Sequence, residues 1–396
     1  MTQAGHPDHR HGAVPLWRNV HVLGAVAQVA VVVAVAIGAA YLVNNLTTAM
    51  AERGLTFGYD FLSRRAGFEI GESPVPYSAT DTYGDAFIVG LLNTLFVSVV
   101  GIVLATVLGV IIGVGRLSPN WLVSHVAAGY VEVIRNTPLL VQLFLIYFVV
   151  LLQLPAVRDT IALPGSIFLN QRGLFVPGPQ LGHTFGTWLA ILGAGLVIAV
   201  AARVVSARRE AAGHHTHRLG LAGLLVFIGL AVAGWIVVGG APMTFDLPMR
   251  SRFNFSGGLA LSTSFTALLA GLVIYTAAFI AEVVRGGIQA VRRGQLEAAR
   301  ALGLSEGDTL RLVVFPQALR VIVPPLTSQY LNLAKNSSLA IAVGYPDLFK
   351  IGTTMANQTG QPVPVIALVM GTYLSISLAT SLLMNLYNRR VQVLEG

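Results

Sequence analysis

The feature that most constrains the fold is a series of apolar runs, each long enough to cross a lipid bilayer. One of them, "FIVGLLNTLFVSVVGIVLATVLGVIIGVG" at residues 87–115, contains no charged residue. About 20 mostly apolar residues in a helix span the hydrocarbon core of a membrane. Only 11% of all residues are charged, whereas soluble domains have roughly a quarter. We therefore expect an all-α polytopic membrane protein, since the alternating segments of a membrane β-barrel are absent from the sequence.

The apolar runs predict about eight transmembrane helices. They lie at about 20–43, 86–115, 120–154, 185–203, 219–239, 259–284, 318–345 and 364–388. In the third, Pro138 is expected to bend the helix. In the second, Gly109 and Gly113 have the spacing typical of close helix packing. Most Lys and Arg residues fall in loops that are inner when the N-terminus is placed in the cytoplasm, so both termini are predicted to be cytoplasmic. The net charge of +8 follows this topology and does not predict a nucleic-acid partner.

Between the sixth and seventh spans lies a charged stretch, "EAARALGLSEGDTLRLVVFPQALR", residues 297–320. Its first residues are good helix formers, and Gly303 is placed to end that helix in a left-handed cap. Ser305 and Asp308 have the spacing of a capping box and begin a second short helix, which Pro316 is expected to end or kink. Two short helices joined rigidly to two spans can pass movement from a cytosolic partner into the membrane. The alternative is an amphipathic surface loop without a partner.

The same stretch resembles the EAA loop of binding-protein-dependent ABC importer permeases. Five residues match that loop in register, namely Glu297, Ala298, Ala299, Gly303 and Pro316. Val313 and Phe315 replace the Ile and Leu of the family pattern. The resemblance implies that these residues, with Ser305 and Asp308, couple the chain to an ATPase.

Longer stretches resemble polar amino-acid permeases. They are "LLNTLFVSVVGIVLATVLGVIIGVGRLS", "YVEVIRNTPLLVQLFLIYF", "AAFIAEVVRGGIQAVRRGQLEAARALGL" and "FPQALRVIVPPLTSQYLNLAKNSSLAIAVG". The segments "FLSRRAGFEIG", "FLNQRGLFVP" and "YPDLFKIGTTMANQTGQ" resemble the first permease subunit of general L-amino-acid importers for glutamate, glutamine, aspartate and asparagine. This implies the transmembrane fold of a type I ABC importer with a cytoplasmic coupling loop.

The resemblance also implies an assembly in the bacterial inner membrane. Its expected partners are an ABC ATPase dimer, a second permease subunit, a periplasmic amino-acid-binding protein and the lipid bilayer. A heterodimer of permeases is favoured over a homodimer. The sequence has no P-loop, so ATP and magnesium are expected in the partner ATPase. In this chain we expect no cofactor, metal or catalytic site, and no enzyme activity.

These expectations divide the chain into seven segments. They are a disordered cytoplasmic N-terminus (1–19), the first transmembrane helix (20–43), a periplasmic segment (44–85), the first part of the permease core (86–154), an inserted periplasmic segment with a transmembrane hairpin (155–258), the second part of the core with the coupling loop 285–317 (259–390), and a cytoplasmic tail (391–396). The hairpin is expected at the periphery.

Two spans contain charged residues, which are costly in lipid and by default mark function. Glu132 and Arg135 lie three residues apart on one helix face. Arg135 lies about 22 Å along that helix from Asn120, which predicts a position in the outer half of the membrane. Two interpretations stay open: an internal salt bridge that packs the bundle, or an Arg135 that faces the pathway and binds a substrate carboxylate.

The other polar stretch inside a span is "NLAKNSS", residues 332–338. Lys335 is also predicted in the outer half, with Asn332, Asn336 and Ser337 nearby. These residues either line the translocation route or pack against a partner permease. Cations without a matching excess of acids favour acidic or amide-bearing substrates. The competing function is an ion-coupled secondary amino-acid transporter, which would need a coupling-ion site within this chain.

Overall fold

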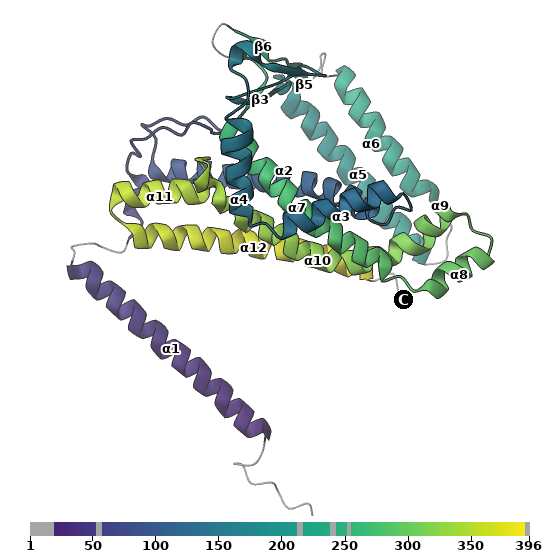
Figure 1. Ribbon diagram of the computed structural model, residues 1–396, viewed down its shortest axis with the longest axis horizontal. Helices are drawn as coiled ribbons and strands as arrows, with labels where there is room; N and C mark the ends of the chain where they lie inside the picture. The colour runs from purple at the N-terminus through teal and green to yellow at the C-terminus, as the bar shows by residue number, and fades with distance from the viewer. Residues whose placement is uncertain (1–19, 53–57, 212–216, 238–242, 252–254, 393–396) are drawn as a thin grey trace, which may run out of the picture.

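The structure, a computed structural model, describes residues 20–52, 58–211, 217–237, 243–251 and 255–392. The predicted disordered segment 1–19 and the end of the predicted tail, 393–396, lie outside these residues. Helices dominate the described chain (Figure 1).

Six described helices are long and apolar enough to cross a membrane. They correspond to the predicted spans 1, 2, 4, 6, 7 and 8. The helices are α1 (Val20–Glu52), α2 (Tyr83–Gly115), α5 (Phe185–Ala211), α7 (Thr263–Gln289), α10 (Phe315–Asn336) and α12 (Pro362–Gln392). For the predicted span at 219–239, α6 (His217–Val237) offers only a shorter apolar helix, Leu225–Ile236, among the described residues. Among the described residues, six helices thus qualify as spans, or seven if the bent pair described next counts as one, against the eight predicted.

The broken helix is the predicted third span. It consists of α3 (Trp121–Arg135) and α4 (Leu139–Phe144), the latter continued by a π-helical segment, Leu145–Leu151. The two parts meet at an angle of 105°, far more than the bend expected from Pro138. Gln142 stabilises the break, because its side-chain amide donates to the carbonyl oxygens of Ile134 and Thr137, both at 2.9 Å.

The centre of the helical body is formed by α2 and α7. Gly109 and Gly113 let them approach closely, as predicted: a Cβ at Gly113 would lie only 2.7 Å from the carbonyl oxygen of Ala281. Leu268 and Leu272 of α7 are fully buried. Further helices complete the body, namely α8 (Arg293–Ala301), α9 (Glu306–Asp308) and α11 (Leu348–Thr359). Figure 1 places α8 and α11 at opposite ends.

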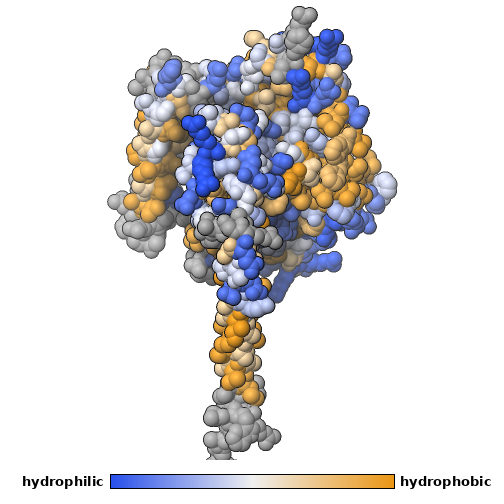
Figure 2. Space-filling model, turned by 90° about the vertical axis from the view of Figure 1, so that its left-hand side faces the viewer, coloured by the Kyte–Doolittle hydropathy of each residue, from blue (hydrophilic) through white to orange (hydrophobic). Residues whose placement is uncertain are grey.

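Two helical units have little contact with this body. The spanning window of α1 has no buried residue within the described chain. Helices α5 and α6 pack on each other, with Gly223 of α6 against Ala199 and Ala202 of α5. Figure 2 shows broad apolar areas on the α1 rod and on the sides of the main body. Such surfaces are stable in lipid, because a helix pairs its backbone N–H and C=O groups internally.

Short strands gather at one side of the helical body (Figure 1), and the all-α expectation did not include them. One antiparallel sheet has the order β1-β2-β3-β8 (Ile161–Leu163, Ile167–Asn170, Gly173–Val176 and Leu259–Ser262). Two pairs complete the set: β4 (Gly178–Leu181) with β5 (Met243–Asp246), and β6 (Met249–Arg250) with β7 (Phe255–Ser256). The predicted sixth span therefore starts too early, because residues 259–262 form β8. Likewise, the predicted periplasmic segment 44–85 is helical up to Glu52.

Candidate transport and coupling sites

The charged loop begins with a helix that ends as predicted. Helix α8 stops at Ala301, and Gly303 follows with a φ of +75°. The amide of Gly303 donates to the carbonyl of Arg300 at 3.0 Å, and the amide of Leu304 donates to that of Ala299 at 3.2 Å. These two bonds define a Schellman motif, in which glycine best tolerates the left-handed backbone.

The second predicted helix is real but does not end at Pro316. The Ser305 hydroxyl caps it by accepting from the amide of Asp308 at 3.1 Å, and it donates to the Asp308 carboxylate at 2.6 Å. From Glu306 the chain continues through a π-helical segment, Thr309–Val314, directly into α10. Pro316 lies in the first turn of α10, directly after the π-helical segment. Of the two outcomes expected at Pro316, an end or a kink, the end does not occur, because the chain continues into α10.

The loop exposes some of its matched residues and buries one. Ala299 is 2% exposed, whereas Glu297, Ala298, Gly303, Ser305 and Asp308 are all exposed. The loop is also shorter than the predicted 285–317, because α7 runs to Gln289. What remains is a capped helix that presents Glu297 and Ala298 outward, on a backbone joined to α7 and α10.

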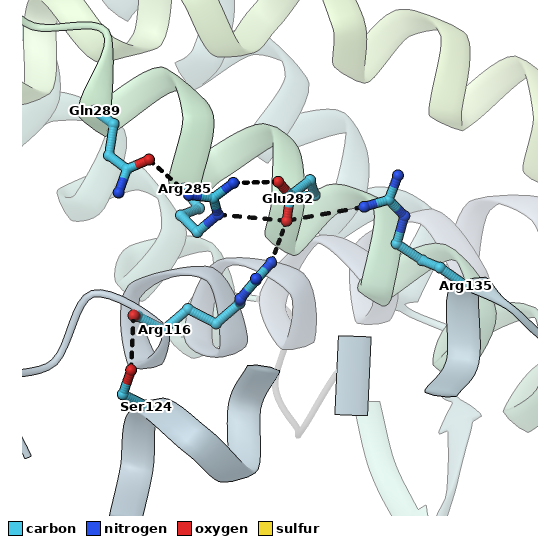
Figure 3. Close-up of polar contacts among 6 residues, drawn as sticks. All are labelled: Arg116, Ser124, Arg135, Glu282, Arg285 and Gln289. Atoms are coloured by element: carbon cyan, nitrogen blue, oxygen red, sulfur yellow. Dashed lines mark hydrogen bonds and ion pairs between the residues drawn. The ribbon is translucent and has the colours of Figure 1, made fainter. Parts of the chain in front are cut away.

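A cluster of charges lies near the loop end of α7, centred on Glu282 (Figure 3). The Arg285 guanidinium donates to both carboxylate oxygens of Glu282, and its Nη1 also donates to the Gln289 side chain at 2.6 Å. Arg116, just beyond α2, donates to the same carboxylate. Glu282 thus ties the end of α2 to α7. Nothing local in the sequence pointed to the pairing of Glu282 with Arg116.

Arg135 approaches the same carboxylate from the end of α3. Its Nη1 lies 3.9 Å from Glu282 Oε2, and its guanidinium lies 5.2 Å from the centre of the Phe279 ring. Among the described residues, no ion pair joins Arg135 to Glu132. The salt bridge left open as one interpretation is therefore not formed with Glu132. Arg135 turns to α7 instead.

The two intramembrane cations lie at different depths, contrary to the prediction. At roughly 1.5 Å per residue, Lys335 lies about 30 Å along α10 from Phe315 at the loop end. By the same rise, Glu282, which Arg135 approaches, lies about 10 Å from the loop end of α7 at Gln289. Arg135 therefore belongs to the half of the body near the loop. The error came from treating residues 120–154 as one helix along the membrane normal.

Lys335 lines a cavity of about 610 Å³ between the end of α10, α11 and α12. Polar neighbours in this cavity are Ser338, Asn357 and Tyr373, and the remaining walls are mostly apolar. The other predicted residues of this stretch do not line it. Ser337 is fully buried and donates to the carbonyl of its own helix at Ala334, at 2.8 Å. Asn332 is exposed and Asn336 half-buried.

Asp347, which the sequence analysis did not single out, is fully buried at the start of α11. Its carboxylate accepts from the Lys350 amide at 2.8 Å and from the Tyr373 hydroxyl at 3.1 Å. Burial raises the pKa of Asp347 to about 6, and the hydrogen bonds from Lys350, Phe349 and Tyr373 limit that rise. The available signal was "YPDLF", in which Asp follows Pro directly before an apolar helix, the usual place of an N-cap.

Known proteins resemble this chain over nearly its whole length. The family model described as "Binding-protein-dependent transport system inner membrane component" matches residues 105–393. The chain belongs to this family. The permease is 47% identical to the putative amino-acid ABC transporter permease protein YhdX of Escherichia coli over 93% of its length and 94% of that protein's.

Two further relatives match the permease over nearly its whole length. It is 46% identical to the general L-amino acid transport system permease protein AapQ of Rhizobium johnstonii, over 90% of its own length and 88% of that of AapQ. It is 41% identical to BztB of Rhodobacter capsulatus, a glutamate/glutamine/aspartate/asparagine transport system permease protein, over 93% of both chains. The match therefore includes the inserted strands and hairpin as well as the two parts of the permease core.

Proposed function

We propose that this permease is the transmembrane subunit of an ATP-driven importer of polar L-amino acids of the glutamate, glutamine, aspartate and asparagine class. The names of AapQ, a general L-amino acid permease, and BztB, a glutamate/glutamine/aspartate/asparagine permease, support the class. The observation that carries the proposal is the capped loop, which exposes Glu297 and Ala298 on a rigid connection between α7 and α10. A carrier driven by an ion gradient has no ATPase and therefore needs no exposed element on which an ATPase docks.

In this proposal the loop is cytoplasmic and docks on an ATPase subunit. ATP and magnesium bind to the two ATPases, whose closure moves α8 and, through it, α7 and α10. The body then alternates between openings to the two sides of the inner membrane. A periplasmic amino-acid-binding protein delivers substrate, and a second permease, in a heterodimer, completes the route.

The cavity at Lys335 is the proposed outer part of the substrate route. It lies at the end of the body away from the loop and combines one ammonium group with the hydroxyls of Ser338 and Tyr373 and the amide of Asn357. A cation that lines a cavity with neutral donors favours a substrate side chain that carries a carboxylate or an amide. Lys335 is therefore proposed to bind the side-chain carboxylate of glutamate or aspartate.

Single-cysteine crosslinking tests the docking of the loop. The chain has no natural cysteine, so a cysteine at Ala298 reports one position only. In the complex reconstituted with its ATPase, Ala298→Cys should crosslink to the ATPase. Ser73→Cys, exposed on a different segment, should not. Absence of any crosslink from Ala298→Cys in a complex that hydrolyses ATP would contradict the docking.

Uptake measurements test the energy source. Proteoliposomes with the permeases, the ATPase and the binding protein should take up glutamate only when they contain ATP and magnesium. Uptake that continues without ATP but stops when the proton gradient is dissipated would identify an ion-coupled carrier instead.

A further inference from the structure

The cavity beside Glu282 has a volume of about 500 Å³ and lies between α3, the end of α2 and α7. Its polar lining consists of Arg116, Glu132, Arg135, Asn136 and Glu282. It is distinct from the cavity at Lys335, with which it shares no lining residue. Five charged groups meet here, because Arg285 also contacts Glu282.

The ion pairs divide these charges unequally. Glu282 is already occupied, since Arg285 donates to both of its oxygens and Arg116 to one of them. Arg135 stays outside hydrogen-bond distance, at 3.9 Å. Its side chain is also the most open of the three, with 40% exposed against 20% for Arg116 and 28% for Arg285. Figure 3 shows its guanidinium reaching toward Glu282 from the side opposite Arg285.

Glu132 is the remaining carboxylate of the cavity. It is exposed, and among the described residues it takes part in no ion pair or side-chain hydrogen bond. Residues three apart on a helix have Cβ atoms about 5–6 Å apart. Glu132 and Arg135 thus offer one negative and one positive group to the same cavity, without neutralising each other.

The backbone of a free amino acid carries the complementary pair of charges. Its α-carboxylate matches the planar fork of an Arg side chain, and its α-ammonium group matches a carboxylate. We infer that this cavity is a second amino-acid subsite, in which Arg135 binds the α-carboxylate and Glu132 the α-ammonium group. The amide of Asn136, next to Arg135 in the lining, is placed to bind either substrate end.

This inference rests on the proposed function and deepens it. A subsite that binds the α-carboxylate and α-ammonium group recognises the part that all L-amino acids share. The Lys335 cavity, farther from the loop, then recognises the side chain of the substrate. The separation gives one chain tolerance of several substrates at the inner subsite and preference among them at the outer one. Glu282 is then a positioning residue, which holds the Arg135 guanidinium toward the cavity.

The test uses ligands that each lack one backbone group. The complex of permeases and ATPase is purified without ATP and without binding protein, so that only the membrane sites bind. Affinities are measured by titration for L-glutamate, for γ-aminobutyrate, which lacks the α-carboxylate, and for 2-hydroxyglutarate, which lacks the ammonium group. The wild type should prefer glutamate over both analogues by about ten- to hundredfold, as expected for one charge-assisted contact.

Each variant should abolish one preference only. Arg135→Gln should bind glutamate and γ-aminobutyrate with similar affinity and keep its preference over 2-hydroxyglutarate. Glu132→Gln should show the reverse. Arg135→Lys and Glu132→Asp keep the charge and should restore part of each preference. Arg172→Gln, an exposed cation outside both cavities, is the matched control and should behave as the wild type.

A purely structural role predicts a different result. In that case Arg135→Gln and Glu132→Gln would lower the unfolding temperature of the complex and leave both ligand preferences at wild-type values, which would overturn the subsite. Failure of the proposed function looks different again. The wild-type complex with its binding protein would then fail to transport any amino acid with ATP.

Discussion

Gly303 allows a quantitative test of the loop. Its φ of +75° costs an L-residue with a Cβ about 1–2 kcal/mol. No heavy atom lies within 4 Å of a Cβ built on Gly303, so the cost of Gly303→Ala comes from the backbone alone. Part of it is offset, because alanine also restricts the unfolded chain by about 0.4–1 kcal/mol. The net destabilisation is about 1 kcal/mol, which raises the equilibrium constant for opening of the cap roughly fivefold.

Two comparisons make the reasoning specific. Gly303→Asn should cost less than Gly303→Ala, because Asn tolerates the left-handed region. Gly294, in the first turn of α8, also has open space around it but no positive φ. Gly294→Ala should therefore stabilise α8 by up to about 1 kcal/mol. Two exposed glycines of one loop are expected to respond with opposite signs.

Hydrogen exchange measures this effect directly. The amides of residue 303 and Leu304 donate the two cap bonds, so their exchange should accelerate in Gly303→Ala and slow in Gly294→Ala. In the reconstituted importer, Gly303→Ala should also consume more ATP per transported amino acid, while membrane insertion stays normal. Equal exchange rates in wild type and Gly303→Ala would refute the argument, as would equal acceleration in both alanine variants.

Three further predictions concern the body of the permease. Lys335→Gln should lower glutamate uptake about ten- to hundredfold relative to glutamine uptake, because one charge-assisted contact is lost; an unchanged ratio in transport assays would exclude direct contact. Gly113→Ala places a Cβ 2.7 Å from the Ala281 carbonyl and should destabilise the complex by about 1–3 kcal/mol in thermal unfolding, whereas Gly129→Ala, with open space, should not. The pKa of Asp347, raised from 3.8 to about 6, means that the folded state binds the proton more tightly. Stability should therefore fall by at most about 3 kcal/mol as pH rises from about 4 through 6. Asp347→Asn should remove this dependence in unfolding measured at pH 5 and 7.5, and an unchanged pH slope would count against it.

Local backbone chemistry explains what the sequence predicted correctly. The cap at Gly303 and the N-cap at Ser305 depend on residues within one turn of each other, so their spacing in the sequence is enough to define them. The approach of α2 to α7 at Gly109 and Gly113 is similar, because only a residue without a side chain permits the contact. Apolar length alone located six helices.

The errors arose where the outcome depends on tertiary contacts or on helix direction. Spacing gave the position of Arg135 along a helix but not the 105° break that follows it. It could not show that Arg116, more than 160 residues away in the sequence, meets Glu282. An end of the helix was one of the two outcomes expected at Pro316, because a π-helical segment that leads into a helix with a proline has no clear sequence signal.

The pairing of β4 with β5 has a consequence for how this chain is put together. Leu181 lies opposite Met243 in that pair, so the chain leaves for α5 and returns from α6 at neighbouring points of one antiparallel ladder. Residues 182–242 are therefore an insertion whose two ends are held side by side by the β4–β5 pair. A tight turn between Leu181 and Met243 would connect the two strands without moving them. A shortened chain with a turn in place of residues 182–242 would therefore show what the permease core does without the inserted hairpin.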